Sequence, residues 1–240
     1  MVWEVEMRVL SFEYRARTGH FLRAEGGTAW MSYPFPPRTV LLGLLGAVLG
    51  MEKDTPQRLL ERARFAVSGP APMGHWHKAQ IRQDRYLLEP RGLKHTREPN
   101  PKLQNQQWLW RPCYQVDVAL EDHWQQELEQ RLEQERYHFS PCMGMSEMLA
   151  EVEFKGTCQA LPLPENVYDL QSLCPRDVGT LQSRVALERE LALSFLRMPV
   201  SVNAERVFVH REYLYERDGR PLPVKTAEAW QLGDRKVVWM

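Results

Sequence analysis

The stretch Tyr33–Gly50, YPFPPRTVLLGLLGAVLG, combines a proline pair, apolar residues at helical spacing and several glycines. The prolines end an extended run, and the leucines and valines that follow predict a helix. Gly43, Ala47 and Gly50 form a second stripe of small residues on this helix. Because a glycine inside a helix costs about 1 kcal/mol relative to alanine, we expect a neighbouring strand or a ligand to approach the backbone closely here.

Working outward from this helix, the hydrophobic periodicity predicts an α+β protein. Strand-like alternation occurs at residues 4–9, 65–67, 110–120 and 148–154, and further helices are expected to open at Thr55 and Asp122. The order strand, helix, strand, strand, helix, strand resembles a βαββαβ ferredoxin-like unit. Between the middle strands, residues 69–101 are rich in proline and predict a protruding loop or long hairpin.

The remainder of the chain predicts a β-rich C-terminal extension. Strands are expected at Arg206–Tyr215 and Lys236–Trp239, and the turn Arg217–Arg220 is expected to pair the first of these with Leu222–Val224 as a hairpin. Residues 185–197 are compatible with either a helix or a strand. We therefore divide the chain into residues 1–155, with an insertion at about 76–111, and residues 156–240.

Composition excludes several classes of protein. The 240 residues are 43% hydrophobic and 26% charged, as in an ordinary globular protein. The longest apolar stretch has twelve residues, short of the ~20 needed to span a bilayer. The N-terminus lacks the basic region of a secretory signal, and the four cysteines form no C-x-x-C pair. We expect a cytoplasmic protein with reduced thiols, no membrane association, no metal and no cofactor.

Charge is distributed unevenly along the chain. Residues 1–111 hold 17 Lys and Arg against 10 Asp and Glu, a balance of +7, and the rest carries −7. Within this part, residues 76–111 have a balance of +5. The basic residues of this window are Lys78, Arg82, Arg85, Arg91, Lys94, Arg97, Lys102 and Arg111. Such a concentration is typical of polyanion binding, although a solvated loop is an equally good interpretation of charge alone.

Two blocks of sequence resemble a known family. The segment Tyr33–Gly50 and the later block Pro141–Phe154, PCMGMSEMLAEVEF, are similar to the fifth CRISPR-associated (Cas) protein family, also called CasD, and in particular to its type I-B and I-A members. The second block matches that family's glycine turn and following strand. The blocks occur in the family's order, about 90 residues apart, so the resemblance covers the N-terminal two thirds.

The resemblance implies a fold, a function and a set of partners. The fold is an RNA-recognition-type (RAMP) core with a projecting thumb hairpin, expected within residues 76–111. The function is that of a non-catalytic subunit of a type I Cascade complex for antiviral defence, which holds the 5′ repeat-derived handle of the crRNA. The implied partners are crRNA, the backbone subunit of family seven through the thumb, the large subunit of family eight, and target DNA indirectly.

The resemblance also implies an RNA-binding surface. Its predicted residues are Arg15, Arg17, His20 and Arg23 in the loop after the first strand; Tyr33, Arg38 and Thr39 at the start of the glycine-bearing helix; Lys78, Arg82 and Arg85 in the thumb; and Met143, Gly144, Met145 and Ser146 in the glycine turn. Arg38 and Thr39 would offer a guanidinium and free N–H groups to a phosphate. Alternatively, Arg38 caps a core helix, and the early arginines form an ordinary solvated surface.

One branch of the same family cleaves repeat RNA without a metal, which gives a catalytic alternative. Its ingredients here would be His75, His77, Lys78 and Tyr86, with Tyr33 as a further tyrosine. We expect His75 and His77 to face opposite ways on a strand, which counts against both this alternative and a histidine metal pair. The start of the chain also resembles the non-processing members. A free-standing RNA-binding module and a purely architectural subunit are further alternatives.

Overall fold

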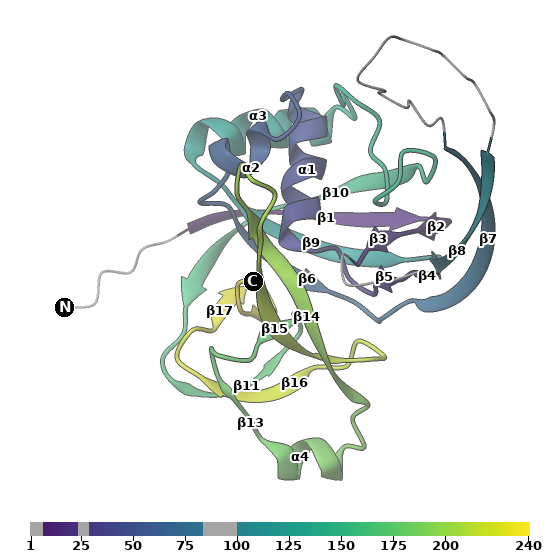
Figure 1. Cartoon of the computed structure of the whole chain (residues 1–240). Helices are drawn as coiled ribbons and strands as arrows, with labels where there is room; N and C mark the ends of the chain where they lie inside the picture. The colour runs from purple at the N-terminus through teal and green to yellow at the C-terminus, as the bar shows by residue number, and fades with distance from the viewer. Residues whose placement is uncertain (1–6, 24–28, 84–99) are drawn as a thin grey trace.

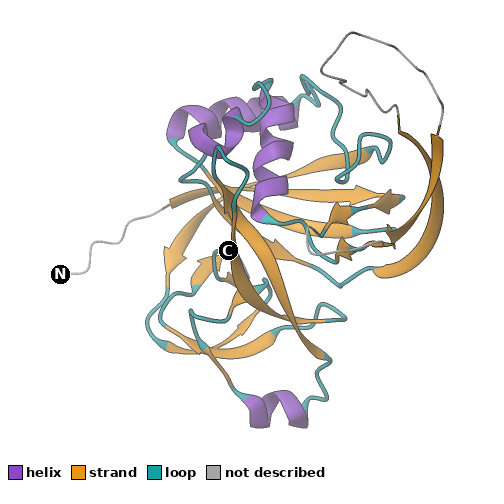
Figure 2. Ribbon diagram, viewed as in Figure 1, coloured by secondary structure: helices purple, strands orange, loops and turns teal. Residues whose placement is uncertain are grey.

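The computed structural model describes residues 7–23, 29–83 and 100–240 (Figure 1). The expected mixed α/β, strand-rich architecture is confirmed: α1, α2 and α3 gather at one end, α4 lies at the other, and strands make up most of the regular secondary structure (Figure 2). Among the helices of the described residues, none is long and apolar enough to cross a membrane.

The largest element of the fold is a six-stranded antiparallel sheet in the order β18-β17-β10-β1-β9-β6. Its strands are β1 (Met7–Ala16), β6 (Arg64–Ser68), β9 (Cys113–Ala119), β10 (Ala150–Pro162), β17 (Trp230–Leu232) and β18 (Arg235–Val237). Helix α1 (Arg38–Leu49) and the short α2 (Thr55–Leu59) lie between β1 and β6 in the chain, and α3 (Asp122–Glu133) lies between β9 and β10. The four central strands and helices α1 and α3 thus follow the chain order strand, helix, strand, strand, helix, strand.

Alternation along the central strands gives the sheet two buried faces. Phe12 and Val116 belong to the main core, together with Leu45 of α1 and Leu128 of α3. On the opposite face, Asp117 is fully buried and receives hydrogen bonds from Ser11 and Arg235. Because Arg235 belongs to β18, this ion pair ties the C-terminal strands to the sheet.

The glycines of α1 have different surroundings from those expected. A Cβ at Gly46 would lie 2.1 Å from Cγ of Pro56, so the close approach is made by the proline ring of α2. Gly50 is not inside the helix: it is the C-cap residue, with φ of 76°. A Cβ at Gly43 would meet no atom within 4 Å. At Gly43 and Gly50, no strand of the described residues makes the expected close approach.

The insertion between β6 and β9 is a long hairpin. Strands β7 (Met73–Gln83) and β8 (Asn100–Trp110) pair over their full length, from Met73 opposite Trp110 to Gln83 opposite Asn100. The hairpin curves away from the body of the molecule (Figure 1). Strand β8 also pairs with β2 (Thr18–Gly19) and, in parallel, with β4 (Ala29–Trp30). Next to this sheet, β3 (Phe21–Leu22) pairs with β5 (Ser32–Tyr33).

The C-terminal part forms two three-stranded sheets. One has the order β11-β16-β13 and the other β12-β15-β14. The elements are β11 (Asn166–Leu170), β12 (Cys174–Pro175), β13 (Thr180–Leu181), α4 (Ser183–Glu188), β14 (Leu193–Val202), β15 (Phe208–Glu216) and β16 (Leu222–Thr226). The ambiguous stretch 185–197 is therefore helix up to Glu188 and strand from Leu193.

Two sequence-based expectations for this part need correction. The turn Arg217–Arg220 does not form a hairpin, because β15 pairs with β14 and β12, whereas β16 pairs with β11 and β13. Instead, the buried carboxylate of Glu216 accepts the N–H groups of Asp218 and Arg220 and directs the chain into the other sheet. The predicted domain boundary, after residue 155, falls inside β10, and β17 and β18 extend the sheet of the N-terminal part.

Candidate nucleic-acid interface

A basic cleft of about 620 Å³ lies where β1 ends and β8 leads into β9. Its lining residues are Arg15, Ala16, Arg17, Trp110, Arg111, Pro112, Cys113 and Glu151. Two backbone hydrogen bonds join the two stretches that line it, from Ala16 N to Pro112 O at 3.1 Å and from Arg111 N to Arg17 O at 3.0 Å. These bonds place three arginines from two separate stretches of chain around one cavity.

The three arginines of the cleft differ in their partners. Arg15 forms ion pairs with Glu13 at 2.8 Å and with Glu151 at 2.9 Å, and the hydrogen bonds to these carboxylates raise the pKa of Arg15. Arg17 and Arg111 are exposed, and neither has an ion pair with any described residue. Their positive charges are therefore the ones available to an anionic ligand.

The glycine turn adjoins this cleft. A Cβ at Gly19 would lie 2.4 Å from Cγ of Met143 and 3.2 Å from Cγ of Pro112, which lines the cleft. Gly144 has φ of 90°, and a Cβ there would lie 1.9 Å from the carbonyl oxygen of His20. Gly144 therefore requires glycine, whereas a side chain at Gly19 would require Met143 to shift. The predicted early loop and the predicted glycine turn, far apart in the sequence, are in direct contact.

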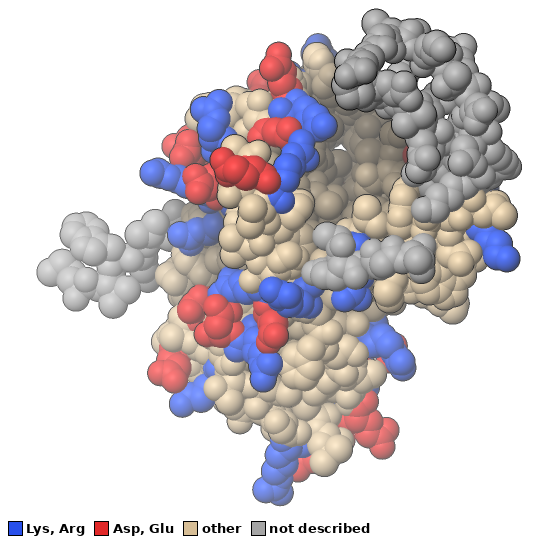
Figure 3. All heavy atoms as spheres, in the orientation of Figure 1, with Lys and Arg blue, Asp and Glu red and all other residues tan. Residues whose placement is uncertain are grey.

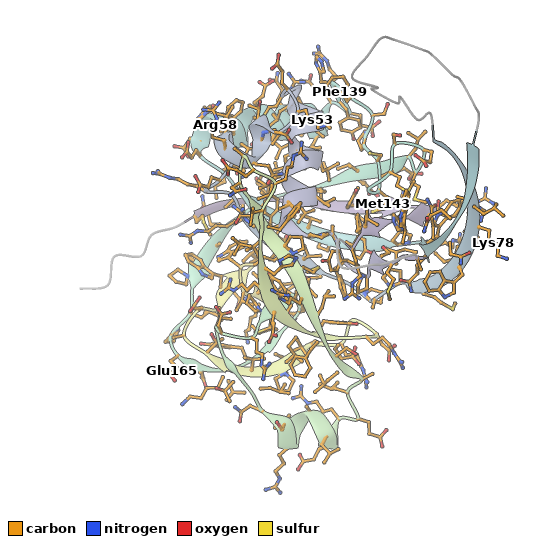
Figure 4. The ribbon with its side chains drawn as sticks, viewed as in Figure 1. Lys53, Arg58, Lys78, Phe139, Met143 and Glu165 are labelled. Carbon is orange, nitrogen blue, oxygen red and sulfur yellow. The ribbon has the colours of Figure 1, made fainter. Side chains whose placement is uncertain are left out.

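Burial changes the roles of several predicted residues. The side chains of His20, Tyr33 and Met143 are 2%, 1% and 0% exposed, which contradicts their predicted place on an RNA-facing surface. Met143 lies inside the molecule, beneath its turn (Figure 4). The exposed members of the turn are Gly144 and Ser146, and Met145 is half-buried. The ring of Tyr33 instead supports Arg23, whose guanidinium carbon lies 5.3 Å from the ring centroid.

His20 connects the early loop to both neighbouring segments. Its Nδ1 is 2.8 Å from the carbonyl oxygen of Gln107 in β8, and its backbone N–H donates to Met143 O at 3.0 Å. The carbonyl is an acceptor, so Nδ1 carries the proton, and the buried Nε2 has no hydrogen-bond partner among the described residues. Burial lowers the pKa of His20, opposed by the Gln107 hydrogen bond and the charge of Glu147.

Arg38 has a structural environment. Its guanidinium donates to the backbone carbonyls of Glu61, Ala63 (3.0 Å) and Val200 (3.1 Å), and burial lowers its pKa. These bonds fix α1 to the segment after α2 and to β14. This environment favours the capping alternative for Arg38 over phosphate binding. Beside it, the carbonyl of Thr39 accepts a hydrogen bond from Gln57 Nε2 at 2.9 Å.

A row of rings follows one face of the β7–β8 hairpin. The His77 ring stacks on Trp108, with 3.9 Å between the ring centroids. His75 makes edge-to-face contacts with Trp108 and Trp110, with centroid distances of 6.1 Å and 5.8 Å. The expectation that His75 and His77 face opposite ways is wrong, because residues two apart on a strand share a face. We call Trp110, His75, Trp108 and His77 the aromatic row.

The remaining thumb residues of the predictions are separated from this row. Lys78 lies on the opposite face of β7 from the histidines, and it points away from the body of the molecule (Figure 4). Arg85 and Tyr86 lie outside the described residues, as does the side chain of Arg82. Within the described part of the chain, no group of three or more His, Cys, Asp or Glu side chains could hold a metal ion.

The wider surface is mixed in charge. Lys, Arg, Asp and Glu side chains are interspersed over the helical end, whereas uncharged atoms line a recess between that end and the hairpin (Figure 3). Trp110 is 45% exposed beside the cleft, and sequence reasoning did not single it out. The signal was present: Trp108 and Trp110 alternate in the same way as His75 and His77 on the facing strand.

Solved structures with a similar fold come from CRISPR systems. A CRISPR protein from Archaeoglobus fulgidus matches with a TM-score of 0.51 at 12% identity, over 96% of this chain and 98% of that chain. A chain of a CRISPR RNA-guided surveillance complex matches with a TM-score of 0.48 at 14% identity, over 89% and 91%. No curated protein matches this sequence.

The family follows from the sequence itself. Residues 9–154 match the family described as CRISPR-associated protein (Cas_Cas5). The chain belongs to this family, and the resemblance of its two glycine-containing blocks is confirmed. The match ends within β10, before the C-terminal sheets begin.

Proposed function

We propose that this protein is a non-catalytic crRNA-binding subunit of a type I Cascade effector in the cytoplasm. It holds the 5′ repeat-derived handle and joins the backbone subunit to the large subunit. In this proposal, β1, α1, β6, β9, α3 and β10 are the ferredoxin-like RAMP core, and β7–β8 is the thumb. Family membership supports association with crRNA.

The basic cleft is the observation that carries this proposal. A single-stranded handle needs cations along its phosphates and planar surfaces for its bases. The cleft offers in one cavity the exposed ring of Trp110 and the charges of Arg17 and Arg111, which have no ion pair with a described residue. The glycine turn, which the family resemblance assigns to the RNA site, adjoins the same cavity through Gly19 and Pro112.

Binding of handle RNA at several salt concentrations tests the proposal. We expect the affinity to fall steeply with salt, and handle RNA to bind more tightly than a scrambled RNA of equal length. Equal affinity for both RNAs would support a general RNA-binding module instead. Absence of salt-dependent binding would support an architectural subunit and would contradict the proposal.

The ribonuclease alternative gains one observation from the structure. His75 and His77 share a face of β7, so the geometric objection to their cooperation no longer holds. Lys78 does not share that face, and the family resemblance points to a non-processing member. Incubation of the protein with repeat RNA in EDTA separates the two functions. A discrete cleavage product that disappears in the variant His75→Ala/His77→Ala would establish catalysis.

The thumb assignment needs its own test, because it concerns a protein partner. Replacement of residues 84–99 by a short linker retains both described strands of the hairpin. We expect this variant to fold and to bind RNA, but to copurify poorly with the backbone subunit. Normal copurification would contradict a thumb that meets that subunit.

A further inference from the structure

The aromatic row has two exposed rings, His77 and Trp110, and two half-buried rings, His75 and Trp108, the latter packed against the main core. Cross-strand pairing places His75 opposite Trp108 and Met73 opposite Trp110, so the four rings share one face of the hairpin. Trp108 Nε1 donates to Gln106 Oε1 at 2.9 Å, which fixes the orientation of its ring. His77 then covers one side of Trp108 at 3.9 Å. The rings are therefore held in place before any ligand binds.

The row is continuous with the basic cleft. Trp110 belongs to both, since it lines the cleft and contacts His75 at 5.8 Å. Arg111 directly follows Trp110 in the chain. Thr18 of β2, which pairs with Trp110, directly follows Arg17. The exposed guanidinium groups of Arg17 and Arg111 thus lie at one end of the row, and the exposed ring of His77 lies at the other.

We propose that the aromatic row is a stacking platform for unpaired RNA bases, which begins at Trp110 beside phosphates held by Arg17 and Arg111. This inference rests on the proposed function and specifies how the RNA continues from the cleft along the hairpin. Stacking on aromatic rings is sequence-tolerant and adds to phosphate binding in single-strand-binding proteins. The row contains rings and no carboxylate, and its cleft end is cationic, which suits a nucleic-acid strand.

An abasic scan of the RNA measures stacking separately from phosphate binding. Each nucleotide of the handle oligonucleotide in turn loses its base but keeps its phosphate, and affinity is measured for wild-type protein and for Trp110→Ala. Trp110 is 45% exposed, so its truncation should leave the fold intact. We expect at least one abasic position to weaken wild-type binding roughly 5- to 150-fold and to change the affinity of the variant less than about twofold.

Trp76 provides a matched control on the same strand pair. It is 58% exposed but lies on the opposite face, where it pairs with Gln107. We expect Trp76→Ala to bind every RNA as wild type does. If Trp110→Ala retains wild-type affinity and the same abasic profile, the stacking platform is wrong. An equal loss from Trp76→Ala would also overturn it.

The outcomes distinguish this inference from the proposed function. Tight, handle-selective binding without any dependence on the row refutes the platform and leaves the subunit proposal intact. Absence of handle binding by wild-type protein refutes both. If Trp110→Ala leaves RNA binding unchanged but weakens assembly with another Cascade subunit, the row is a protein-docking surface and the inference is wrong.

Discussion

The start of α1 and the early loop that lines the basic cleft were both predicted to bind RNA through arginine, yet the two regions use arginine differently. At the start of α1, the donors of Arg38 are directed to three backbone carbonyls. In the cleft, Arg17 and Arg111 remain exposed without ion pairs to described residues. The difference teaches that a basic residue in a family motif can serve the fold, and that binding capacity lies with charges that the fold leaves unused.

The largest effect is expected at the start of α1, where Arg38→Ala should destabilise the protein. Each carbonyl left without a donor costs about 1–3 kcal/mol if it stays dry, so we expect a loss of about 3 kcal/mol in the free energy of unfolding. Urea denaturation measures it. The protein that remains folded should bind RNA with nearly wild-type affinity. Unchanged stability together with weakened RNA binding would show that Arg38 binds RNA and does not serve the fold, which contradicts this account.

The cleft side has its own structural requirement, at Gly144. Gly144→Ala places a Cβ against the His20 carbonyl and strains a residue with positive φ, so we expect a loss of about 2–3 kcal/mol in unfolding free energy. Gly43→Ala is the matched control, because Gly43 is a residue of α1 at which a Cβ would meet no atom within 4 Å. This variant should stabilise the protein by up to about 1 kcal/mol, since alanine favours a helix more than glycine does. Equal effects at the two glycines would refute this account of the turn.

The unused charges of the cleft should affect binding rather than folding. For Arg17→Glu/Arg111→Glu we expect about 10- to 100-fold weaker RNA binding, or about 1.4–2.7 kcal/mol. The slope of log affinity against log salt should also become shallower by about 1.4, the value for two lost phosphate contacts on a single strand. Arg184→Glu, in α4 at the far end of the C-terminal part (Figure 1), should change neither quantity. An unchanged slope in the double variant would show that these arginines do not bind phosphate.

The smallest effect concerns the junction of the early loop, the hairpin and the turn. Burial lowers the pKa of His20 in the folded state, so below about pH 6.5 the unfolded state binds the proton more readily. Stability from this group is therefore present above that pH and is lost as the pH falls. The free energy of unfolding, measured by denaturation, should fall less from pH 7.5 to pH 5.5 for His20→Gln than for wild type. Equal losses would mean that His20 does not contribute.

Local patterns predicted much of the central fold. The helical spacing in α1 depends on neighbours in sequence, and this helix occurs where the periodicity indicates. The alternation at residues 4–9 and 148–154 indicated two strands correctly but not their ends, because β1 continues to Ala16, with Arg15 on the strand rather than in a loop, and β10 continues to Pro162. The close contacts of Gly19 with Met143 and of Gly144 with His20 could not be predicted from local patterns, because they depend on the three-dimensional path of the chain. The same is true of Arg38, whose acceptors come from residues 61, 63 and 200.

Two wrong predictions, one in the hairpin and one in the C-terminal part, have different causes. The shared face of His75 and His77 follows from strand geometry and was available from the sequence. The C-terminal turn at Arg217–Arg220 was not, because a turn motif says nothing about whether the next strand returns to the same sheet. Here the buried Glu216 and the close contact of Gly219 with Pro70 determine its path.

Crosslinking of handle RNA to the folded protein tests the central claim most directly. A single 4-thiouridine is placed at successive positions of the handle, irradiated in the complex, and the modified peptides are identified by mass spectrometry. We predict crosslinks within residues 15–17 and 108–113, around the basic cleft and the near end of the aromatic row. Crosslinks confined to residues 33–39, at the start of α1, would contradict the account.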